Sequence, residues 1–249
     1  MENINFELPT CWGDLSQDEL RWIFVRMARY SGTGEHAWLS VASELALKRG
    51  RITVLSPYGR NWLIRYKGKK QVMDREEFTA VCRSLEWLSG IPEIPLRLDH
   101  IGEAQAVDAD VIDELTFSSW LTLENYWQGY NSTRDESLLR EMAGILYPDL
   151  PDGRRLSPAE KINIFYWWAA VKERVARMFP HFYRSTGENA DTPDPDTIRR
   201  AIDAQIRALT KGDITKEGQV LEMTAARALT ELDAQAREYE ELNRKYPKK

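Results

Sequence analysis

Few residues in this chain have the types and spacings that catalysis or metal binding requires. The three histidines, His36, His100 and His181, lie far apart, and none has a second histidine, a cysteine or paired carboxylates at metal-ligand spacing. Cys11 and Cys82 form no spacing pattern, and the glycine-framed serine motif of many hydrolases does not occur. The sequence therefore predicts no catalytic residue, no metal site, no cofactor and a non-enzymatic protein.

Two short segments share only part of a ligand-binding pattern. The lysine-rich turn "KGKK" is not a Walker loop, because Leu63 and Lys70 occupy the positions that need glycine and serine or threonine. In the acidic run 108–114, Ile112 and Asp113 stand where a calcium loop requires Asp or Asn and Gly. We expect this run to be a solvated loop that leads into a helix.

Positive charge gathers in residues 48–75, which hold nine Lys or Arg and a single acid, Asp74. Such a stretch, with aromatic rings available to stack on bases, is typical of nucleic-acid contact. The candidate residues are Arg60, Trp62, Arg65, Tyr66, Lys67, Lys69 and Lys70.

An internal explanation of the same charge is also open. Residues 93–124 reverse the balance, with eight acids against Arg97. The basic strands could face this neighbour within one fold, or simply keep the sheet edges soluble. The closeness of the acidic stretch in sequence favours this explanation.

Around this basic stretch, the N-terminal half reads as helices and a small sheet. Residues 15–30 form an expected helix with Ser16 and Glu19 as a capping box, and a second helix should end at Gly50 in a left-handed cap. Short β-prone runs at 51–56, 61–66 and 70–74, separated by turn signals, predict a three-stranded antiparallel meander. Asp74 then caps a helix that runs to about residue 89.

The C-terminal half reads as helical throughout, and one helix should be central. In residues 157–179, Ser157 and Glu160 form a start signal, and the aromatic run 165–168 follows. The polar residues, among them Asn163, fall on one narrow arc, and large apolar residues fill most of the rest. We expect this helix to be buried on two or three sides.

These patterns predict a predominantly helical α+β fold in several parts. The expected parts are an α+β domain with the basic meander at 1–115, a helical core at 116–183, a flexible loop at 184–197 and C-terminal helices at 198–249.

The last helix, residues 224–245, carries apolar residues along one narrow heptad seam on an otherwise charged surface. Such a seam accommodates one neighbour, which can be the protein's own domain or a partner. The candidate partner-binding residues are Leu229, Leu232, Ala236, Tyr239 and Tyr246.

The C-terminal third, residues 208–249, resembles uncharacterised proteins encoded in prophages and related mobile elements of gut bacteria. The segments "YWQGY", "EMAGILYP" and "FYWW" share this resemblance. It implies a gene neighbourhood of tail morphogenesis and a protein-binding role as a tail-assembly chaperone or a minor tail or virion component. The alternative function is a nucleic-acid-binding protein of a mobile element that uses residues 48–75.

The sequence offers no sign of a membrane or secretory segment. The first residues lack the basic and apolar regions of a signal peptide, and the apolar run 164–171 is far shorter than the roughly 20 residues of a membrane span. With two unpatterned cysteines, this predicts a location in the bacterial cytoplasm, or association with a virion, and no membrane partner.

Overall fold

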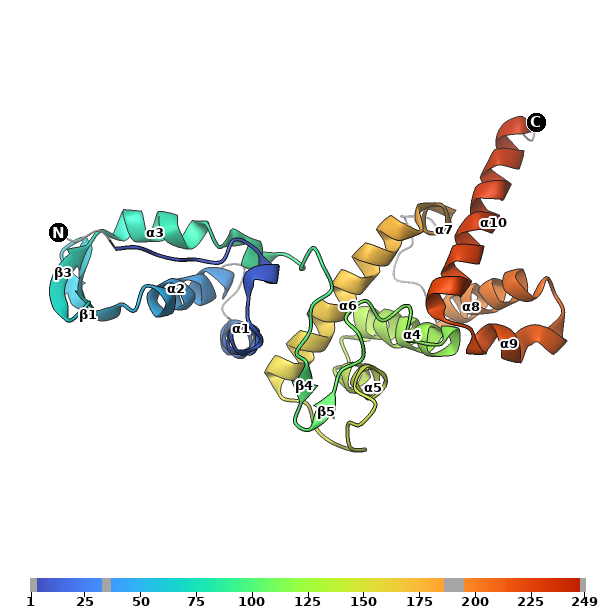
Figure 1. Ribbon diagram of the computed structural model, residues 1–249, viewed down its shortest axis with the longest axis horizontal. Helices are drawn as coiled ribbons and strands as arrows, with labels where there is room; N and C mark the ends of the chain where they lie inside the picture. The colour runs from blue at the N-terminus through green and yellow to red at the C-terminus, as the bar shows by residue number, and fades with distance from the viewer. Residues whose placement is uncertain (1–3, 33–36, 186–194, 247–249) are drawn as a thin grey trace. The chain divides into compact units, whose positions relative to one another are not determined.

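The protein is a predominantly helical α+β chain with a small antiparallel sheet, as the sequence predicts (Figure 1). The computed structural model describes residues 4–32, 37–185 and 195–246. The chain divides into two compact units. Unit 1 comprises Met1–Leu98 and Ser157–Tyr166, and unit 2 comprises Asp99–Leu156 and Trp167–Lys249. The first boundary of this division lies between Leu98 and Asp99, whereas the sequence analysis placed it at residue 115. A segment distant in sequence, Ser157–Tyr166, completes unit 1.

Unit 1 packs helices and a sheet around one apolar core. Its elements are a short 3-10 helix (Trp12–Asp14), α1 (Gln17–Tyr30), α2 (Ala37–Arg49), β1 (Thr53–Tyr58), β2 (Asn61–Tyr66), β3 (Lys69–Met73), α3 (Arg75–Arg83), a second 3-10 helix (Glu86–Ser89) and residues 158–166, the first part of α6. Fully buried side chains from four of these elements, among them Phe24, Leu45, Ile64 and Leu88, form the core.

The predicted helix starts in unit 1 are confirmed, and two predicted helix ends are wrong: α3 ends at Arg83 and not near residue 89, and the cap after α2 differs. Ser16 and Glu19 form the capping box of α1, and the Asp74 carboxylate accepts hydrogen bonds from two backbone N–H groups of α3. After α2, however, the left-handed residue is Arg51, with φ of 52°, and not Gly50. A Cβ at position 50 would lie 2.8 Å from Cδ1 of Ile52 and 3.1 Å from the carbonyl oxygen of Ala46, so a larger residue there would require Ile52 to shift.

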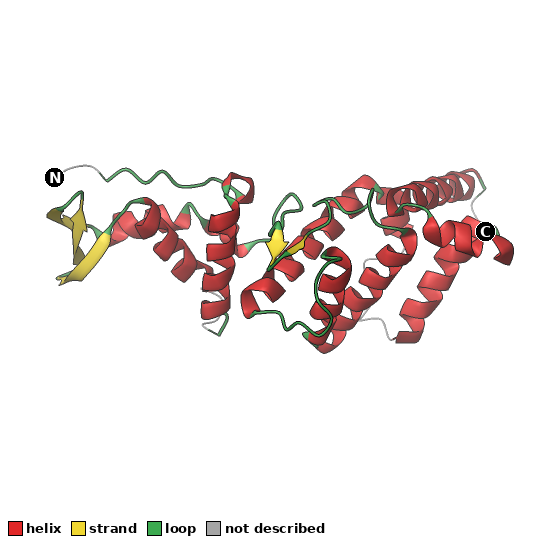
Figure 2. Cartoon of the chain, turned by 60° about the horizontal axis from the view of Figure 1, so that its bottom comes forward, coloured by secondary structure: helices red, strands yellow, loops and turns green. Residues whose placement is uncertain are grey.

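The sheet of unit 1 is the predicted meander, with strand order β1-β2-β3 (Figure 2). Because side chains alternate across a strand, its two faces differ in composition. The inner face carries Trp62, Ile64, Tyr66 and Met73, of which all but the half-buried Trp62 are buried. On the outer face, these pairs of residues lie directly opposite each other on neighbouring strands: Tyr58 and Asn61, Ser56 and Leu63, Thr53 and Arg65, and Arg65 and Lys70.

Unit 2 is built almost entirely from helices. Its elements are a two-stranded ribbon of β4 (His100–Ile101) and β5 (Ala104–Gln105), then α4 (Phe117–Thr133), α5 (Ser137–Leu146), most of α6 (Pro158–Met178), α7 (Pro180–Ser185), α8 (Pro195–Thr210), a 3-10 helix (Ile214–Lys216), α9 (Glu217–Glu222) and α10 (Ala225–Lys245). The loop expected at 184–197 falls largely on residues 186–194, outside the described residues.

Helix α6 is as deeply buried as the aromatic run predicts. Trp167 and Trp168 are fully buried in unit 2, and the indole N–H of Trp167 donates to the carbonyl of Ala109 at 2.7 Å. The polar arc is less exposed than expected, because Asn163 is also fully buried. Its side-chain oxygen accepts a hydrogen bond from the backbone N–H of Leu98 at 2.8 Å, so this buried oxygen has a hydrogen-bond partner.

Within the described ranges, no helix combines the length and the apolar character that a membrane span requires.

Candidate functional site

The first candidates for a functional site are the side chains that could bind a metal. Among the described residues, no cluster of three or more His, Cys, Asp or Glu side chains has the arrangement of a metal site. The Cys82 thiol is buried, with its Sγ 3.7 Å from Oγ of Ser43, and burial raises its pKa. A thiol of raised pKa is a poor nucleophile, so Cys82 is a core residue.

The best-developed polar cluster lies in unit 2 around Lys172. Its ammonium group is 2.5 Å from a carboxylate oxygen of Glu124 on α4 and 3.2 Å from the hydroxyl of Tyr183 on α7. Burial by itself lowers the pKa of Lys172, but the Glu124 carboxylate and Tyr183 outweigh it, and the net pKa is raised. A lysine held charged in this way is a poor base. We therefore interpret the cluster as a link between α4, α6 and α7.

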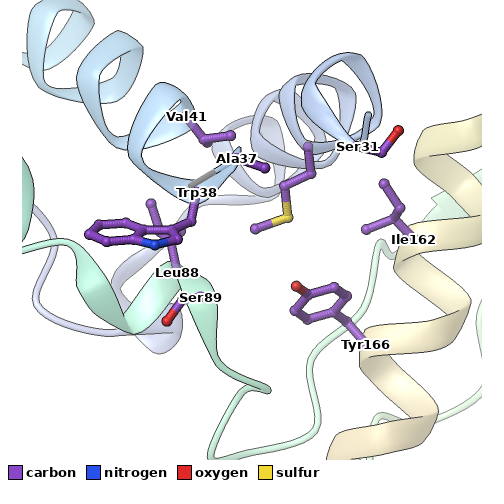
Figure 3. Close-up of a pocket in the computed structure, with 9 residues that line it drawn as sticks. Ser31, Ala37, Trp38, Val41, Leu88, Ser89, Ile162 and Tyr166 are labelled. Atoms are coloured by element: carbon purple, nitrogen blue, oxygen red, sulfur yellow. The ribbon is translucent and has the colours of Figure 1, made fainter. Parts of the chain in front are cut away.

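Unit 1 contains a hollow of about 280 Å³ with an apolar lining (Figure 3). It is lined by Met27, Ser31, Ala37, Trp38, Val41, Leu88, Ser89, Ile162 and Tyr166. The Tyr166 hydroxyl points toward the hollow, and burial raises the pKa of this group. The serine hydroxyls each donate to a backbone carbonyl, of Ala28 and Glu86 respectively. Two lining residues, Ser31 and Ala37, lie close in sequence to residues 33–36, which are outside the described residues. We therefore assign no ligand to the hollow.

Several basic side chains of the meander region are engaged within unit 1. Arg49 forms an ion pair of 2.7 Å with Glu19, and Lys48 lies 4.6 Å from the ring centroid of Trp22. Two more lie over rings of the sheet, Lys67 over Tyr66 and Arg75 over Trp62. These residues stabilise the unit by ion pairing and cation–π contact and are less free to bind a ligand.

Four of the remaining five cations differ from these. Arg51, Arg60, Arg65 and Lys70 are exposed, and none has an ion-pair or cation–π partner in the part of the chain that the structure describes. Two carboxylates of the acidic stretch are engaged with α6 instead, since Glu124 pairs with Lys172 and Asp110 pairs with Arg174 at 3.1 Å. These two carboxylates are therefore paired within unit 2.

The two rings that were candidates for base stacking lie on the inner face of the sheet. Tyr66 is only 6% exposed, and Trp62 packs against Phe78 with ring centroids 5.3 Å apart. We correct the candidate set accordingly, because both rings contribute to the core. The exposed ring of the outer face is Tyr58, at 61% exposure, which the sequence analysis missed. The alternation of apolar residues along 61–66 could have indicated that Trp62 and Tyr66 share the buried face.

The seam of α10 also divides into two parts. Leu229 and Leu232 are buried in unit 2, where α10 packs against α7, α8 and α4, so neither is a surface for a partner. Ala236 is half-buried. Tyr239 and Tyr246 are 61% and 75% exposed, and Leu242 between them is 56% exposed. We name Tyr239, Leu242 and Tyr246 the exposed stripe.

The sequence analysis missed Leu242, because a strict heptad assigns the core position to Asn243. The helix drifts relative to a heptad repeat, and the exposed stripe therefore lies to one side of the buried seam. Exposed charges surround it, with Glu238 and Glu241 near its start and Arg244 and Lys245 near its end.

Comparison of the chain with protein-family models, curated proteins and solved structures finds no match.

Proposed function

We propose that this protein is a non-enzymatic assembly protein of a phage-like particle, which acts by binding another protein through the C-terminal part of α10. In this proposal it serves in a bacterial host as a tail-assembly chaperone or as a minor tail or virion component. The resemblance of residues 208–249 to prophage proteins supports the biological setting. The exposed stripe supports the mode of action.

The observation that carries the proposal is the change in burial along α10. Ala225, Leu229 and Leu232 are buried within unit 2, whereas the exposed stripe continues the same helix with large apolar side chains in water. Apolar side chains grouped at i, i+3 and i+7 on one helix face are the pattern by which an amphipathic helix docks into a groove. The described part of unit 2 leaves this pattern without a covering element.

The charges around the exposed stripe restrict the chemistry of the partner. The partner needs basic groups near Glu238 and Glu241 and acidic groups near Arg244 and Lys245, because complementary charges favour the correct orientation. It also needs a groove that contacts more than three side chains, since stable interfaces bury about 1,200 Å² or more in total. A groove on another assembly protein meets this need better than the exposed stripe of a second copy.

Affinity capture from an induced lysogen tests the proposal. The full chain carries a tag at its N-terminus and is compared with a triple variant, Tyr239→Ser, Leu242→Ser and Tyr246→Ser. We expect one protein to be captured by the wild type and lost with the triple variant, while both proteins show the same unfolding curve. A matched control, Ile214→Ser, removes an exposed apolar side chain of the same unit that is 82% exposed and should keep the partner.

Two results would contradict the proposal. One is equal capture of the same proteins by the wild type and the triple variant. The other is loss of capture accompanied by unfolding of the triple variant, which would show that the three side chains are part of the core.

A further inference from the structure

The outer face of the sheet in unit 1 presents like charges directly opposite each other. Arg65 on β2 is the register partner of Lys70 on β3, and such pairs have Cβ atoms about 5 Å apart. Like charges at this separation repel and destabilise a sheet. Thr53 on β1 completes the row across the three strands and adds a hydroxyl group.

Nothing in the sheet neutralises this pair. Residues 51–73 contain no Asp or Glu, and Asp74, the next residue, uses its carboxylate to cap α3. Arg51, which is two residues before Thr53, adds a third exposed cation near the same end of the sheet. Arg51, Arg65 and Lys70 lack an ion-pair partner in the described ranges, so an external anion would relieve the repulsion.

An exposed aromatic ring lies on the same face. Tyr58 pairs with Asn61, and Asn61 and Arg65 share the outer face of β2 because they are four residues apart. The ring is therefore about 13 Å along the sheet from the cations, at roughly 3.3 Å per residue. A sheet face that combines a free ring with unpaired cations is the arrangement on which single-stranded nucleic acid stacks and neutralises its phosphates.

We propose that the outer face of the meander binds single-stranded nucleic acid, with Arg51, Arg65 and Lys70 at the phosphates and Tyr58 stacked on a base. This site is separate from the exposed stripe of α10 and does not depend on it. The contact reads no sequence, because the groups it uses recognise phosphates and the faces of bases. The net charge of −5 for the whole chain means that binding depends on this local face.

Fluorescence anisotropy with a labelled oligothymidylate of about 15 nucleotides tests the proposal. Three neutralised phosphates predict a salt slope of about −2, so binding should weaken about 20-fold between roughly 50 and 200 mM salt. The double variant Arg65→Gln with Lys70→Gln should lose at least about tenfold in affinity and most of this slope. The matched control Arg199→Gln with Arg200→Gln removes the same charge from exposed positions on α8 and should bind like the wild type.

The stacking part of the proposal has its own pair of variants. Tyr58→Ala should weaken binding about fivefold or more, whereas Tyr58→Phe should retain it, because the ring and not the hydroxyl stacks. All these side chains are exposed, so circular dichroism should show an unchanged fold for each variant.

The proposal is overturned if the wild type shows no binding at about 50 mM salt, or if the double variant and its matched control lose affinity equally. It is also overturned if duplex DNA binds as tightly as the single strand, since a duplex offers no base to Tyr58. Preferential binding to vesicles that contain phosphatidylserine, in place of the oligonucleotide, would assign the face to a membrane surface and reject the proposal.

Discussion

Asp233 on α10 holds the first turn of α7 through its contact with His181. One oxygen of its carboxylate accepts hydrogen bonds from the backbone N–H groups of His181 and Phe182, at 2.8 and 3.0 Å. A carboxylate oxygen of Glu240, also on α10, lies 2.9 Å from Nδ1 of the His181 ring. These contacts fix the first turn of α7 against α10 between Asp233 and Glu240.

Replacing Asp233 should loosen this attachment. Asp233→Ala removes the acceptor of two N–H groups at a helix start, and we expect the free energy of unfolding to fall by about 1–2 kcal/mol. Urea denaturation measures the change, with Glu238→Ala as a control at an exposed acid of the same helix. An effect of Asp233→Ala no larger than that of the control would mean that α7 is held by other contacts.

Two truncations should separate the buried and exposed parts of α10. A chain that ends after Glu241 loses Leu242 and Tyr246, both exposed, and should keep its melting temperature within about 2 °C. A chain that ends after Leu221 loses Leu229 and Leu232, which are buried, and its melting temperature should fall by several degrees or more. Calorimetry of both chains checks this, and equal losses would contradict the division of the helix.

Removing one charge of the Lys172–Glu124 ion pair should destabilise the fold more than removing both charges. Lys172→Met leaves a carboxylate in a largely enclosed site without its counter-charge, and should cost about 1–3 kcal/mol. The double variant Lys172→Met with Glu124→Leu removes both charges and should recover most of that loss. Denaturation of the two variants provides the measurement. A double variant less stable than the single one would show that the charges contribute beyond their mutual pairing.

The same pair predicts a loss of stability at high pH. The pKa of Lys172 is raised above its ordinary value of 10.5 in the folded protein. A raised pKa means that the charged lysine stabilises the fold at all pH values below 10.5, and that this contribution is lost as the pH rises through the folded pKa. The stability difference between wild type and the double variant should therefore be constant near neutral pH and change only in alkaline solution.

Trp168 tests the central position of α6. Its ring is fully buried and lies 5.1 Å from that of Trp120, measured between centroids. Trp168→Ala should lower the free energy of unfolding by about 3–5 kcal/mol, because it removes a large ring from a packed core. A loss below about 1 kcal/mol in chemical denaturation would contradict this packing.

Local signals in the sequence predicted the elements of the fold well. The start of α6 follows from Ser157 and Glu160, whose predicted capping hydrogen bonds both form. The meander follows from turn residues between short β-prone runs. These features could be predicted because neighbouring residues determine them.

Long-range contacts explain what could not be predicted. Asn163 is buried because it accepts a hydrogen bond from Leu98, 65 residues earlier, and periodicity alone assigns it to the exposed arc. The first part of the α10 seam is buried where α10 packs against α7, α8 and α4, and no local pattern reveals these neighbours. Among the candidate site residues, burial argues against Tyr66, Leu229 and Leu232, exposure adds Tyr58 and Leu242, and the others stay predictions.

The most direct test of the proposed function is site-specific photo-crosslinking from the exposed stripe. A photoreactive benzoyl-phenylalanine replaces Leu242 in the full chain, and, as a control, Ile214, which is also exposed. After irradiation of induced lysogens, position 242 should give a crosslink to one other protein, and position 214 should not. A crosslink from position 242 only to a second copy of the chain, or identical products from both positions, would contradict the account.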